Sequence, residues 1–370
     1  MARYLAVGNL NTNLVWEGEI LSTLPDVDFL HTGPGPDRRG LQKRPTLTIL
    51  NDARRQAYDL VFATENGFPC FNPRKSALRN LSRLVTTVTR HPRVWLGFRF
   101  PYARAGSALA AVDMRDSPII DNSRFGALRQ AVCYFKRELP QNPANAFLYT
   151  TARTEENGNV YHVTFFQNLV GKLRPISIGV GNATVQKCQG FPIAKSVDVF
   201  FAGQVRDRPN RQAGLKQLER LQAEGYRVDI TRELLPADEF LRRCAQARIV
   251  WSPEGFGWDC VRHYEAALAG SVPLLQSPTI RRYMPFEAGE QALYYYIEGE
   301  HLAETVRQAL QNPERLAMMG WAARQHVLRW HTHEALARYI VEETRRTLTP
   351  GSPTKLSLSP ADRQQYGVCP

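Results

Sequence analysis

The chain has 370 residues, of which 43% are hydrophobic and 22% are charged, a composition typical of a soluble globular protein with two domains. Its net charge of +12 attracts phosphates, nucleic acid or anionic lipid. No apolar run approaches the ~20 residues needed to span a bilayer, and the first residues predict a β-strand and not a signal peptide. We therefore expect a cytoplasmic protein, and peripheral attachment to a membrane surface stays open.

The first half alternates short β-type runs with helical patterns, which predicts βαβ units around a mostly parallel sheet. The predicted strands cover residues 3–9, 27–33, 59–67, 93–101 and 132–139. The predicted helices cover residues 13–24, 73–90 and 122–131. The half closes with "KLRPISIGVGN", which ends at Asn182.

The second half repeats this alternation after a linker predicted over residues 179–196. The predicted strands cover residues 197–204, 226–231, 248–253, 271–276 and 292–297. The predicted helices cover residues 211–225, 236–247, 260–270 and the long stretch 300–346. The fold class is therefore α/β, with two Rossmann-like doubly wound domains and a central cleft. We assign residues 1–182 to the first domain, 183–348 to the second and 349–370 to a flexible Pro/Ser-rich tail.

The sequence supports no metal-binding site. The six cysteines form no CxxC pair and have no zinc-type spacing: Cys70, Cys133, Cys188, Cys244, Cys260 and Cys369. The acidic pair Asp26 and Asp28 matches a DxD motif, but a surface turn is the simpler interpretation. His331 and His333 are not spaced as a helical metal pair, and with His326 they are interpreted as solvated or packed residues. We expect no metal and no cofactor.

The most informative stretch is "SPEGFGWDCVRHYEAALAGSVPLL", which runs from Ser252 to Leu275. Gly255 and Gly257 lack Cβ atoms, so backbone can approach a ligand closely there. The helix that follows offers unpaired N–H groups and a partial positive charge, which favour a phosphate. Arg262 adds a guanidinium suited to phosphate oxygens, and Glu265 either accepts hydrogen bonds from a ribose diol or pairs with Arg262.

The same stretch resembles the donor-binding motif of GT-B fold glycosyltransferases of the group-1 type, through Glu254, "GFG" and "YEAALAGSVPLL". It is most similar to the exostosin-type and spore-maturation-type branches, in which an arginine precedes the Glu-Ala pair. The resemblance implies that Arg262 and Glu265 contact the phosphate and the ribose or sugar, with Glu254 as a further donor contact. Glu254 and Glu265 are spaced more widely than in retaining group-1 families, which leaves the stereochemistry open.

A second stretch, "DVFFAGQVRDRPNR", resembles the first strand and loop of the GT-B C-terminal domain. The resemblance places Gly203 and Arg206 at the donor diphosphate, with Arg208 and Arg211 as further candidates. In the first half, "AAVDMRDSPII", "CYFKREL" and "LRPISIGV" are similar to the same bacterial branch. The first domain is then the acceptor-binding domain, and the second binds the nucleotide sugar.

Three residues of the first domain are candidate general bases for inverting transfer. Asp113 and Asp116 follow a predicted strand, and His31 lies near the end of another. A base takes the proton of the acceptor hydroxyl, and histidine titrates near neutral pH. The alternatives are that the aspartates pair with Arg115 or Lys136 and that His31 is a polar loop residue.

These features predict a metal-independent glycosyltransferase that moves a sugar from a nucleoside diphosphate sugar to a hydroxyl acceptor. The acceptor is a glycan or a lipid-linked precursor, or a polyanion such as DNA carrying a modified base. Two other classes stay open: a non-catalytic nucleic-acid-binding protein, and a sugar-nucleotide sensor on the same scaffold. The donor sugar, its nucleotide and the oligomeric state are not encoded in any of these patterns.

Overall fold

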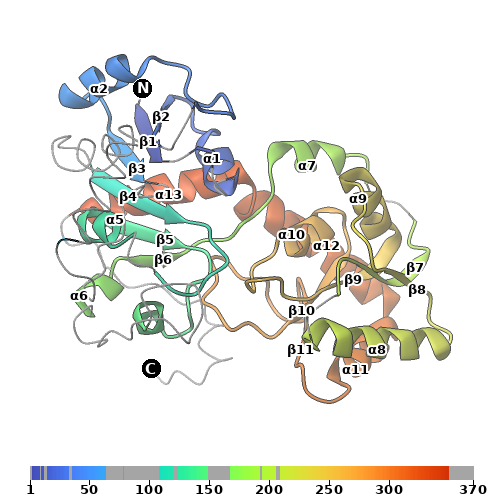
Figure 1. Ribbon diagram of the computed structural model, residues 1–370. Coiled ribbons are helices and arrows are strands. Elements are labelled where there is room, and N and C mark those ends of the chain that lie inside the picture. Colours follow the sequence, from blue (N-terminus) through green and yellow to red (C-terminus); the bar gives the residue numbers. More distant parts are fainter. Residues whose placement is uncertain are drawn as a thin grey trace. The chain divides into compact units, whose positions relative to one another are not determined.

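The computed structural model describes residues 2–8, 10–11, 15–32, 36–63, 78, 108–120, 124–148, 167–191, 194–205 and 209–349. These residues form two compact units (Figure 1). Unit 1 takes the described residues of Met1–Ser177, Ile280–Arg282 and Leu336–Ser357. Unit 2 takes those of Ile178–Thr279 and Tyr283–Ala335. No helix in the described ranges is long and apolar enough to cross a membrane.

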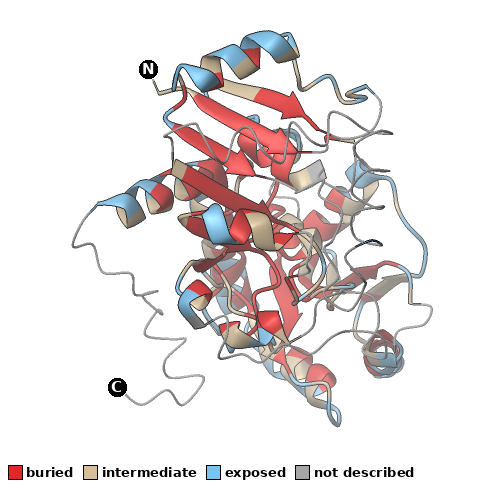
Figure 2. Cartoon of the chain, turned by 60° about the vertical axis from the view of Figure 1, so that its left-hand side comes forward, coloured by how far each residue is buried: buried red, intermediate tan, exposed pale blue. Residues whose placement is uncertain are grey.

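Unit 1 is built on a parallel sheet with the strand order β2-β1-β3-β4-β5-β6. The strands are β1 (Tyr4–Gly8), β2 (Val27–His31), β3 (Leu60–Ala63), β4 (Ala108–Asp113), β5 (Cys133–Lys136) and β6 (Leu173–Pro175). Most of their residues are buried, as Figure 2 shows. Strands buried on both faces are nearly continuous apolar runs, which is why "YLAVG" and "LVFA" were recognisable in the sequence.

Helices pack on both faces of this sheet. The helical elements are α1 (Val15–Leu21), α2 (Thr46–Arg54), α5 (Phe125–Gln130), η2 (Pro143–Phe147) and α6 (Gln167–Val170). Residues of α2, α5, η2 and α6 share one apolar cluster with the strands. Helix α13 (His333–Leu348) packs on the sheet through Tyr339, whose ring lies 5.3 Å from that of Phe135. The chain therefore returns to unit 1 at its last helix.

Unit 2 holds a second parallel sheet with the strand order β11-β10-β9-β7-β8. The strands are β7 (Val197–Ala202), β8 (Val228–Thr231), β9 (Ala247–Ser252), β10 (Val272–Gln276) and β11 (Leu293–Tyr295). The helices are α7 (Asn182–Lys187), α8 (Pro209–Ala223), α9 (Ala237–Gln246), α10 (Val261–Leu268), α11 (His301–Leu310) and α12 (Pro313–Trp330). Together with unit 1, this confirms the predicted α/β class with two Rossmann-like domains.

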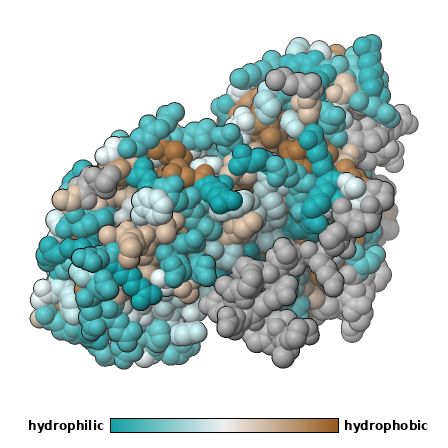
Figure 3. Space-filling model, turned by 180° about the vertical axis from the view of Figure 1, so that it is seen from behind, coloured by the Kyte–Doolittle hydropathy of each residue, from teal (hydrophilic) through white to brown (hydrophobic). Residues whose placement is uncertain are grey.

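Alternating side chains of β7 and β9 divide the core of unit 2 into two layers. Phe201 and Trp251 pack with α8, α11 and α12, whereas Phe200 and Val250 pack with α9 and α10. Helix α8 approaches β9 closely at Gly214, where an added Cβ would lie only 2.3 Å from the Trp251 ring. The side of the protein seen in Figure 3 is mainly hydrophilic, with apolar residues in small groups.

Each sheet has one point at which the strand order changes direction. In unit 1 the chain runs from β1 to β2 on one side and then to β3 on the other, so the change lies between β1 and β3. In unit 2 it lies between β7 and β9, for the same reason. In open α/β sheets, ligands bind outside the carboxyl ends of the strands at this point. These two strand ends are therefore the places to look for a site.

Some elements differ from the sequence-based expectation. The division after Ser177 precedes the predicted boundary at Asn182, and the predicted linker contains α7. Residues 336–348, which we had assigned to the second domain, lie in unit 1 because α13 packs on its sheet. The long predicted helix is three helices, since Asn312 caps α12 by accepting a hydrogen bond from Arg315 N–H, and Pro313 follows it. Apart from Leu78, the helix predicted over 73–90 and the strand predicted over 93–101 lie outside the described residues, as does the tail after Thr349.

Candidate functional site

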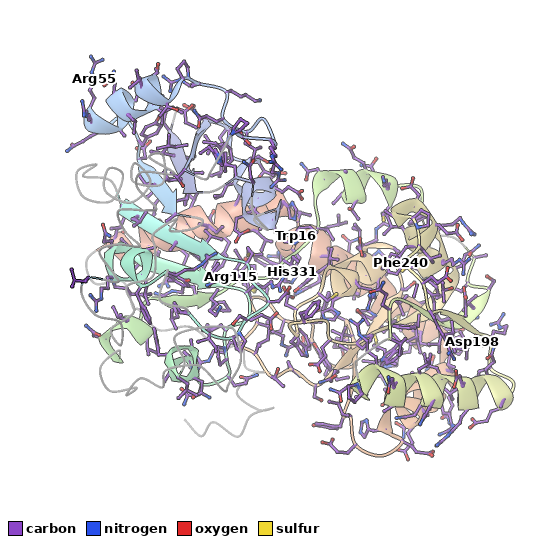
Figure 4. The ribbon with its side chains drawn as sticks, in the orientation of Figure 1. Trp16, Arg55, Arg115, Asp198, Phe240 and His331 are labelled. Atoms are coloured by element: carbon purple, nitrogen blue, oxygen red, sulfur yellow. The ribbon has the colours of Figure 1, made fainter. Side chains whose placement is uncertain are left out.

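The carboxyl ends of β7 and β9 bring together most of the predicted donor-binding residues. The two strands are parallel neighbours, so Gly203 and the Glu254–Asp259 loop follow adjacent strand ends. Helix α10 begins immediately afterwards at Val261, with Arg262 as its second residue. Gly203 and Arg262, which are 59 positions apart in the chain, thus meet at the point where the strand order changes. In Figure 4, Asp198 marks the opposite, amino end of β7.

Gly203 is in contact with the guanidinium of Arg262. A Cβ atom added to Gly203 would lie 3.0 Å from Arg262 Nη2, and its φ of +153° is one that L-residues rarely adopt. The Cζ atom of Arg262 also lies 5.9 Å from the centre of the Phe201 ring. Glycine at this position therefore allows the guanidinium to reach across from α10 to the end of β7.

Arg262 retains unused hydrogen-bonding capacity at this place. Its Nη1 atom is buried and has no hydrogen-bond partner among the described residues. The N-cap residue of α10, Cys260, makes no side-chain capping bond to the first turn. A buried donor without a partner is costly, and for a charged group the cost is larger. An anion at the start of α10 would bond to Nη1 and interact favourably with the positive end of the helix.

Glu265 lies one turn further along α10 than Arg262. Burial raises the pKa of its carboxyl group to about 6, while the positive charge of Arg262 acts in the opposite direction. The carboxylate is therefore the main form at neutral pH, and it can accept hydrogen bonds from a diol. Glu265 thus lies near Arg262 and interacts with its charge, as the sequence predicted.

Arg211 and Glu254 hold in place the loop Glu254–Asp259, which we call the donor loop. Arg211 donates from Nε and Nη2 to Glu254 O at 2.9 and 2.7 Å, and from Nη1 to Gln204 O at 2.8 Å. It thereby joins the segments that follow β7 and β9. Glu254 Oε1 accepts a hydrogen bond from Asn210 Nδ2 at 3.0 Å. The Glu254 side chain therefore contacts the first turn of α8, a contact that its proposed donor-binding role did not anticipate.

A buried polar network beneath the loop was missed in the sequence. Asp259 accepts hydrogen bonds from Ile178 N–H at 2.6 Å and from the Tyr264 hydroxyl at 2.5 Å. His263 donates from Nε2 to Trp258 O at 2.8 Å, so its Nδ1 accepts from the Ser252 hydroxyl at 2.7 Å. These bonds fix the start of α10. The one sequence feature that indicates them is the number of polar side chains within the short stretch "WDCVRHY".

Of the remaining predicted donor-binding residues, some lie in the donor loop and others lie outside the described residues. Gly257 lies in the loop, where its carbonyl accepts a hydrogen bond from Gly255 N–H at 2.8 Å. Phe256 stands between these glycines and is 86% exposed. Arg206 and Arg208 lie outside the described residues. Over the described ranges, no three His, Cys, Asp or Glu side chains are grouped so that they could hold a metal ion.

In unit 1, Asp113 is fully buried within a cluster of charged side chains. Its carboxylate accepts hydrogen bonds from Arg115 Nε at 3.1 Å, Lys136 Nζ at 3.3 Å and the Tyr134 hydroxyl at 2.8 Å, and Arg124 lies 3.4 Å away. Although burial acts in the opposite direction, these cations hold the pKa of Asp113 well below its usual range. A carboxylate that binds protons so weakly is a poor general base. The pairing with Arg115 and Lys136, considered as the alternative, is the arrangement present, and Arg115 lies just beyond β4 (Figure 4).

The other two predicted bases are also engaged. Asp116 is about half exposed and forms an ion pair with Arg137. The ring of His31 is buried, and its Nδ1 accepts a hydrogen bond from Leu10 N–H at 3.0 Å. Its Nε2 lies 3.3 Å from the Asn11 amide nitrogen. His31 is therefore part of the packing at the end of β2, a more structural setting than we expected of a base.

Glu17 is a buried carboxyl group that sequence reasoning missed. Its Oε1 accepts a hydrogen bond from Met114 N–H at 3.0 Å, and its Oε2 is buried without a hydrogen-bond partner among the described residues. Burial raises its pKa to about 7, although the positive charge of Arg124 lowers it in part. The residue lies on α1, next to Trp16, which Figure 4 labels.

The histidines near α12 are packed against other side chains. His326 and His331 both donate from Nε2 to Met284 O at 2.8 Å, and their rings are 5.2 Å apart. His331 also lies 4.7 Å from the Tyr264 ring and is labelled in Figure 4. Burial lowers the pKa of His333 to about 4, so this residue is neutral at pH 7.

Comparison with known proteins agrees with this geometry. A family model described as glycosyl transferase-like matches residues 211–342, which include Glu254, Arg262 and Glu265. No protein with a curated description has significant sequence similarity to the chain.

Solved structures similar to this one include an alpha-glucosyltransferase in complex with UDP and a 13-mer DNA, with a TM-score of 0.50 and 8% identity over 93% of this chain and 100% of that one. A glycosyltransferase from Rickettsia africae has a TM-score of 0.49 and 13% identity, over 94% of this chain and 99% of that one. Anabaena Alr3699/HepE in complex with UDP has a TM-score of 0.44 and 14% identity, over 93% and 100%. The predicted GT-B fold is confirmed, and residues 211–342 match the glycosyl transferase-like family model.

Proposed function

We propose that the protein transfers a sugar from a nucleoside diphosphate sugar to a hydroxyl acceptor without a metal ion. The observation that carries this proposal is the buried Nη1 of Arg262 beside Gly203, at the start of α10, which has no hydrogen-bond partner in the described part of the chain. This arrangement lies where the strand order of unit 2 changes, and Arg262 belongs to the segment that matches the glycosyl transferase-like family.

The diphosphate of the donor would occupy the start of α10. Arg262 would bond to its oxygens, and the N–H groups of the first turn would add a second set of donors. As the bond to the sugar breaks, negative charge grows on the departing diphosphate, and these fixed positive groups stabilise it. Arg206, which follows β7 in the sequence, is expected to add a further positive charge. Glu265 would accept hydrogen bonds from the ribose or the sugar.

Unit 1 is proposed to bind the acceptor. Residues 1–177 contain 23 Lys and Arg against 14 Asp and Glu, so they hold most of the net charge of +12. A positive surface favours an acceptor that carries phosphates or carboxylates. The alpha-glucosyltransferase of the same fold was solved with DNA, so a polyanion is one acceptor class to test beside glycans and lipid-linked precursors.

The first test is a thermal-shift panel with UDP, GDP, CMP and ADP and their sugars, with and without EDTA. A ligand that binds only the folded state raises the melting temperature by mass action. We expect one nucleotide to raise it selectively, with no effect of EDTA. In Arg262→Ala the affinity should fall by about 100-fold, the amount typical of a lost charged hydrogen-bond pair.

A matched control is Arg220→Ala, which removes an exposed arginine of α8 that pairs with Glu300. This variant should bind the nucleotide as the wild type does. If no nucleotide shifts the wild type, or if Arg262→Ala binds equally well, the donor site is wrong. Salt-dependent DNA binding that sugar nucleotides do not alter would then favour the nucleic-acid-binding class. Binding without transfer or hydrolysis would favour the sensor.

A further inference from the structure

Helix α12 is a rigid part of unit 2, packed tightly against the start of β10 (Figure 1). A Cβ atom added to Gly320 would lie only 2.7 Å from the carbonyl oxygen of Gly270, two residues before this strand. The inward side of the helix is buried and comprises Leu316, Met319, Gly320, Ala323 and Val327. Because these residues already hold the helix in place, the residues on its outward side are not needed for packing.

The outward side of α12 carries apolar side chains. Residues three and four positions apart share one face of a helix. The residues of this side are exposed or half-buried, and we call them the α12 patch: Ala317, Met318, Trp321, Ala322, Gln325 and Leu328. Met318 and Trp321 are each 66% exposed and lie one turn apart. Single exposed apolar residues are normal on a protein surface, but large neighbouring ones indicate a binding surface.

The charges at the N-terminal end of the α12 patch are mixed. Glu314 and Arg315 are neighbours in the first turn of the helix. Arg315 donates from Nη2 to Gly289 O at 3.3 Å, and the segment around this glycine contains Glu287 and Glu290. This end of the patch therefore has no preference for a partner of one charge.

The C-terminal end of the α12 patch is basic. It has Arg324 and Arg329, and α12 contains no Asp or Glu after Glu314. The guanidinium carbon of Arg329 lies 4.6 Å from the centre of the Trp330 ring, while Arg324 also donates to two backbone carbonyl groups that follow α7. This end of the patch therefore favours a partner with negative charges.

The size of the α12 patch favours a lipid surface over another protein. Two large apolar side chains present about 300 Å², whereas a stable interface between proteins buries about 800 Å² on each partner. A lipid surface needs no complementary shape. Tryptophan is enriched at the level of the lipid headgroups, and arginines near the surface attract anionic headgroups. The combination of Trp321, Met318 and Arg329 therefore fits the surface of an anionic membrane.

We propose that the α12 patch attaches the protein to the surface of a membrane that contains anionic lipids. Met318 and Trp321 enter the headgroup region, and Arg324 and Arg329 lie beside the lipid phosphates. The attachment does not depend on the proposed glycosyl transfer. Within unit 2 the donor loop follows the carboxyl end of β9, whereas Gly320 packs near the amino end of the parallel strand β10. A lipid surface and a nucleotide would thus use different parts of this unit.

The test is co-sedimentation of the full chain with vesicles of phosphatidylcholine alone, or of equal parts phosphatidylcholine and phosphatidylglycerol. We expect the wild type to bind the anionic vesicles more tightly than the neutral ones. The double variant Met318→Ala, Trp321→Ala should lower the partition coefficient about 10-fold or more, because two large apolar side chains no longer leave water. Arg329→Gln should lower it about 5-fold on the anionic vesicles alone.

Two controls match these variants. Leu234→Ala removes an apolar side chain of unit 2 that is 74% exposed but lies after β8, outside the α12 patch. Arg220→Gln removes an exposed arginine of α8. Both controls should bind the vesicles within about 2-fold of the wild type. The double variant should keep the wild-type melting temperature and nucleotide-induced shift, which would show that it is folded.

Three results would overturn the proposal. If the double variant binds anionic vesicles as tightly as the wild type, the binding comes from the general positive charge and not from the α12 patch. If the wild type binds neither kind of vesicle, there is no attachment to explain. If the wild type sediments as a dimer and the double variant as a monomer, the patch joins two copies of the chain. In each case the proposed function stands, because it fails only with the nucleotide-induced shift.

Discussion

The two sheets of this protein have the same kind of switch point but differ in the charges that they place there. In unit 2, Arg262 has a buried cationic nitrogen that finds no partner among the residues that the structure describes. In unit 1 the buried cations Arg124 and Lys136 are compensated by Asp113, and a carboxyl oxygen of Glu17 lacks a partner within the described ranges. The first arrangement suits an anionic ligand, and the second keeps a carboxyl group protonated to a higher pH than usual. Similar backbone topology thus provides two different electrostatic environments.

The strongest test of this comparison removes the compensating charge in unit 1. Asp113→Asn leaves Arg115, Arg124 and Lys136 without their anion, and we expect a loss of about 3–5 kcal/mol in the free energy of unfolding. Glu19→Gln, which removes the partner of the more exposed Arg39, should cost less than about 1 kcal/mol. Urea unfolding of both variants measures the difference. Equal, small losses would show that the Asp113 cluster does not hold unit 1 together.

The sign of the pH dependence follows from the pKa of Asp113, which is lower in the folded protein than in the unfolded chain. The stabilisation that Asp113 provides is therefore present above its ordinary pKa and is lost as the pH falls through its folded value. In Asp113→Asn this part of the acid unfolding should be missing. Unfolding curves of the variant and the wild type at decreasing pH would reveal it.

A second, somewhat smaller effect is expected from the unpartnered carboxyl group. The pKa of Glu17 rises from 4.5 in the unfolded chain to about 7, so protonated Glu17 favours the folded state. This contribution is fully present below pH 4.5 and is lost as the pH rises through about 7. Glu17→Gln has no such loss, so it should gain up to about 3 kcal/mol relative to the wild type between pH 4 and pH 8.

This gain would be measured as the difference in unfolding free energy between Glu17→Gln and the wild type at each pH. The difference cancels other titrating groups, such as Glu265, whose pKa is raised to about 6. Glu19→Gln serves as the control and should show a smaller trend of the same sign, because burial raises the pKa of Glu19 as well, while Arg39 lowers it in part. A constant difference across this pH range would contradict the assignment of Glu17 as the uncompensated group.

The smallest effect on stability is expected from the unpartnered cation. Replacement of Arg262 by Met removes a charged donor that has unused bonding capacity, so the melting temperature without ligand should stay the same or rise slightly. The nucleotide-induced rise should disappear. A large loss of stability in Arg262→Met without ligand would show that the guanidinium is structural and would remove the contrast between the units.

The sequence alone determined the α/β class and most of the strands, because strands buried on both faces must be apolar along their length. It also determined the donor loop, since the two glycines, Arg262 and Glu265 lie in one short stretch whose spacing reflects the local strand–turn–helix geometry. Gly203 was identified in the same way, from the turn that follows β7. In each case the information is local, as residues that are close in the chain define the backbone and the side chains beside it.

Only the tertiary structure decided which charged groups are satisfied. The sequence left open whether Asp113 is a base or an ion-pair partner, and its contacts with Arg124 and Lys136 in the folded chain decide for the ion pair. Nothing in the sequence indicated the environment of Glu17, because its hydrogen-bond partner Met114 is 97 positions away. The return of α13 to unit 1 was hidden for a similar reason, since it depends on contacts such as that between Phe135 and Tyr339. Burial and the neighbouring charges set the proton affinity of a side chain and its unmet hydrogen bonds. Both depend on segments that meet only when the chain folds, so no local pattern records them.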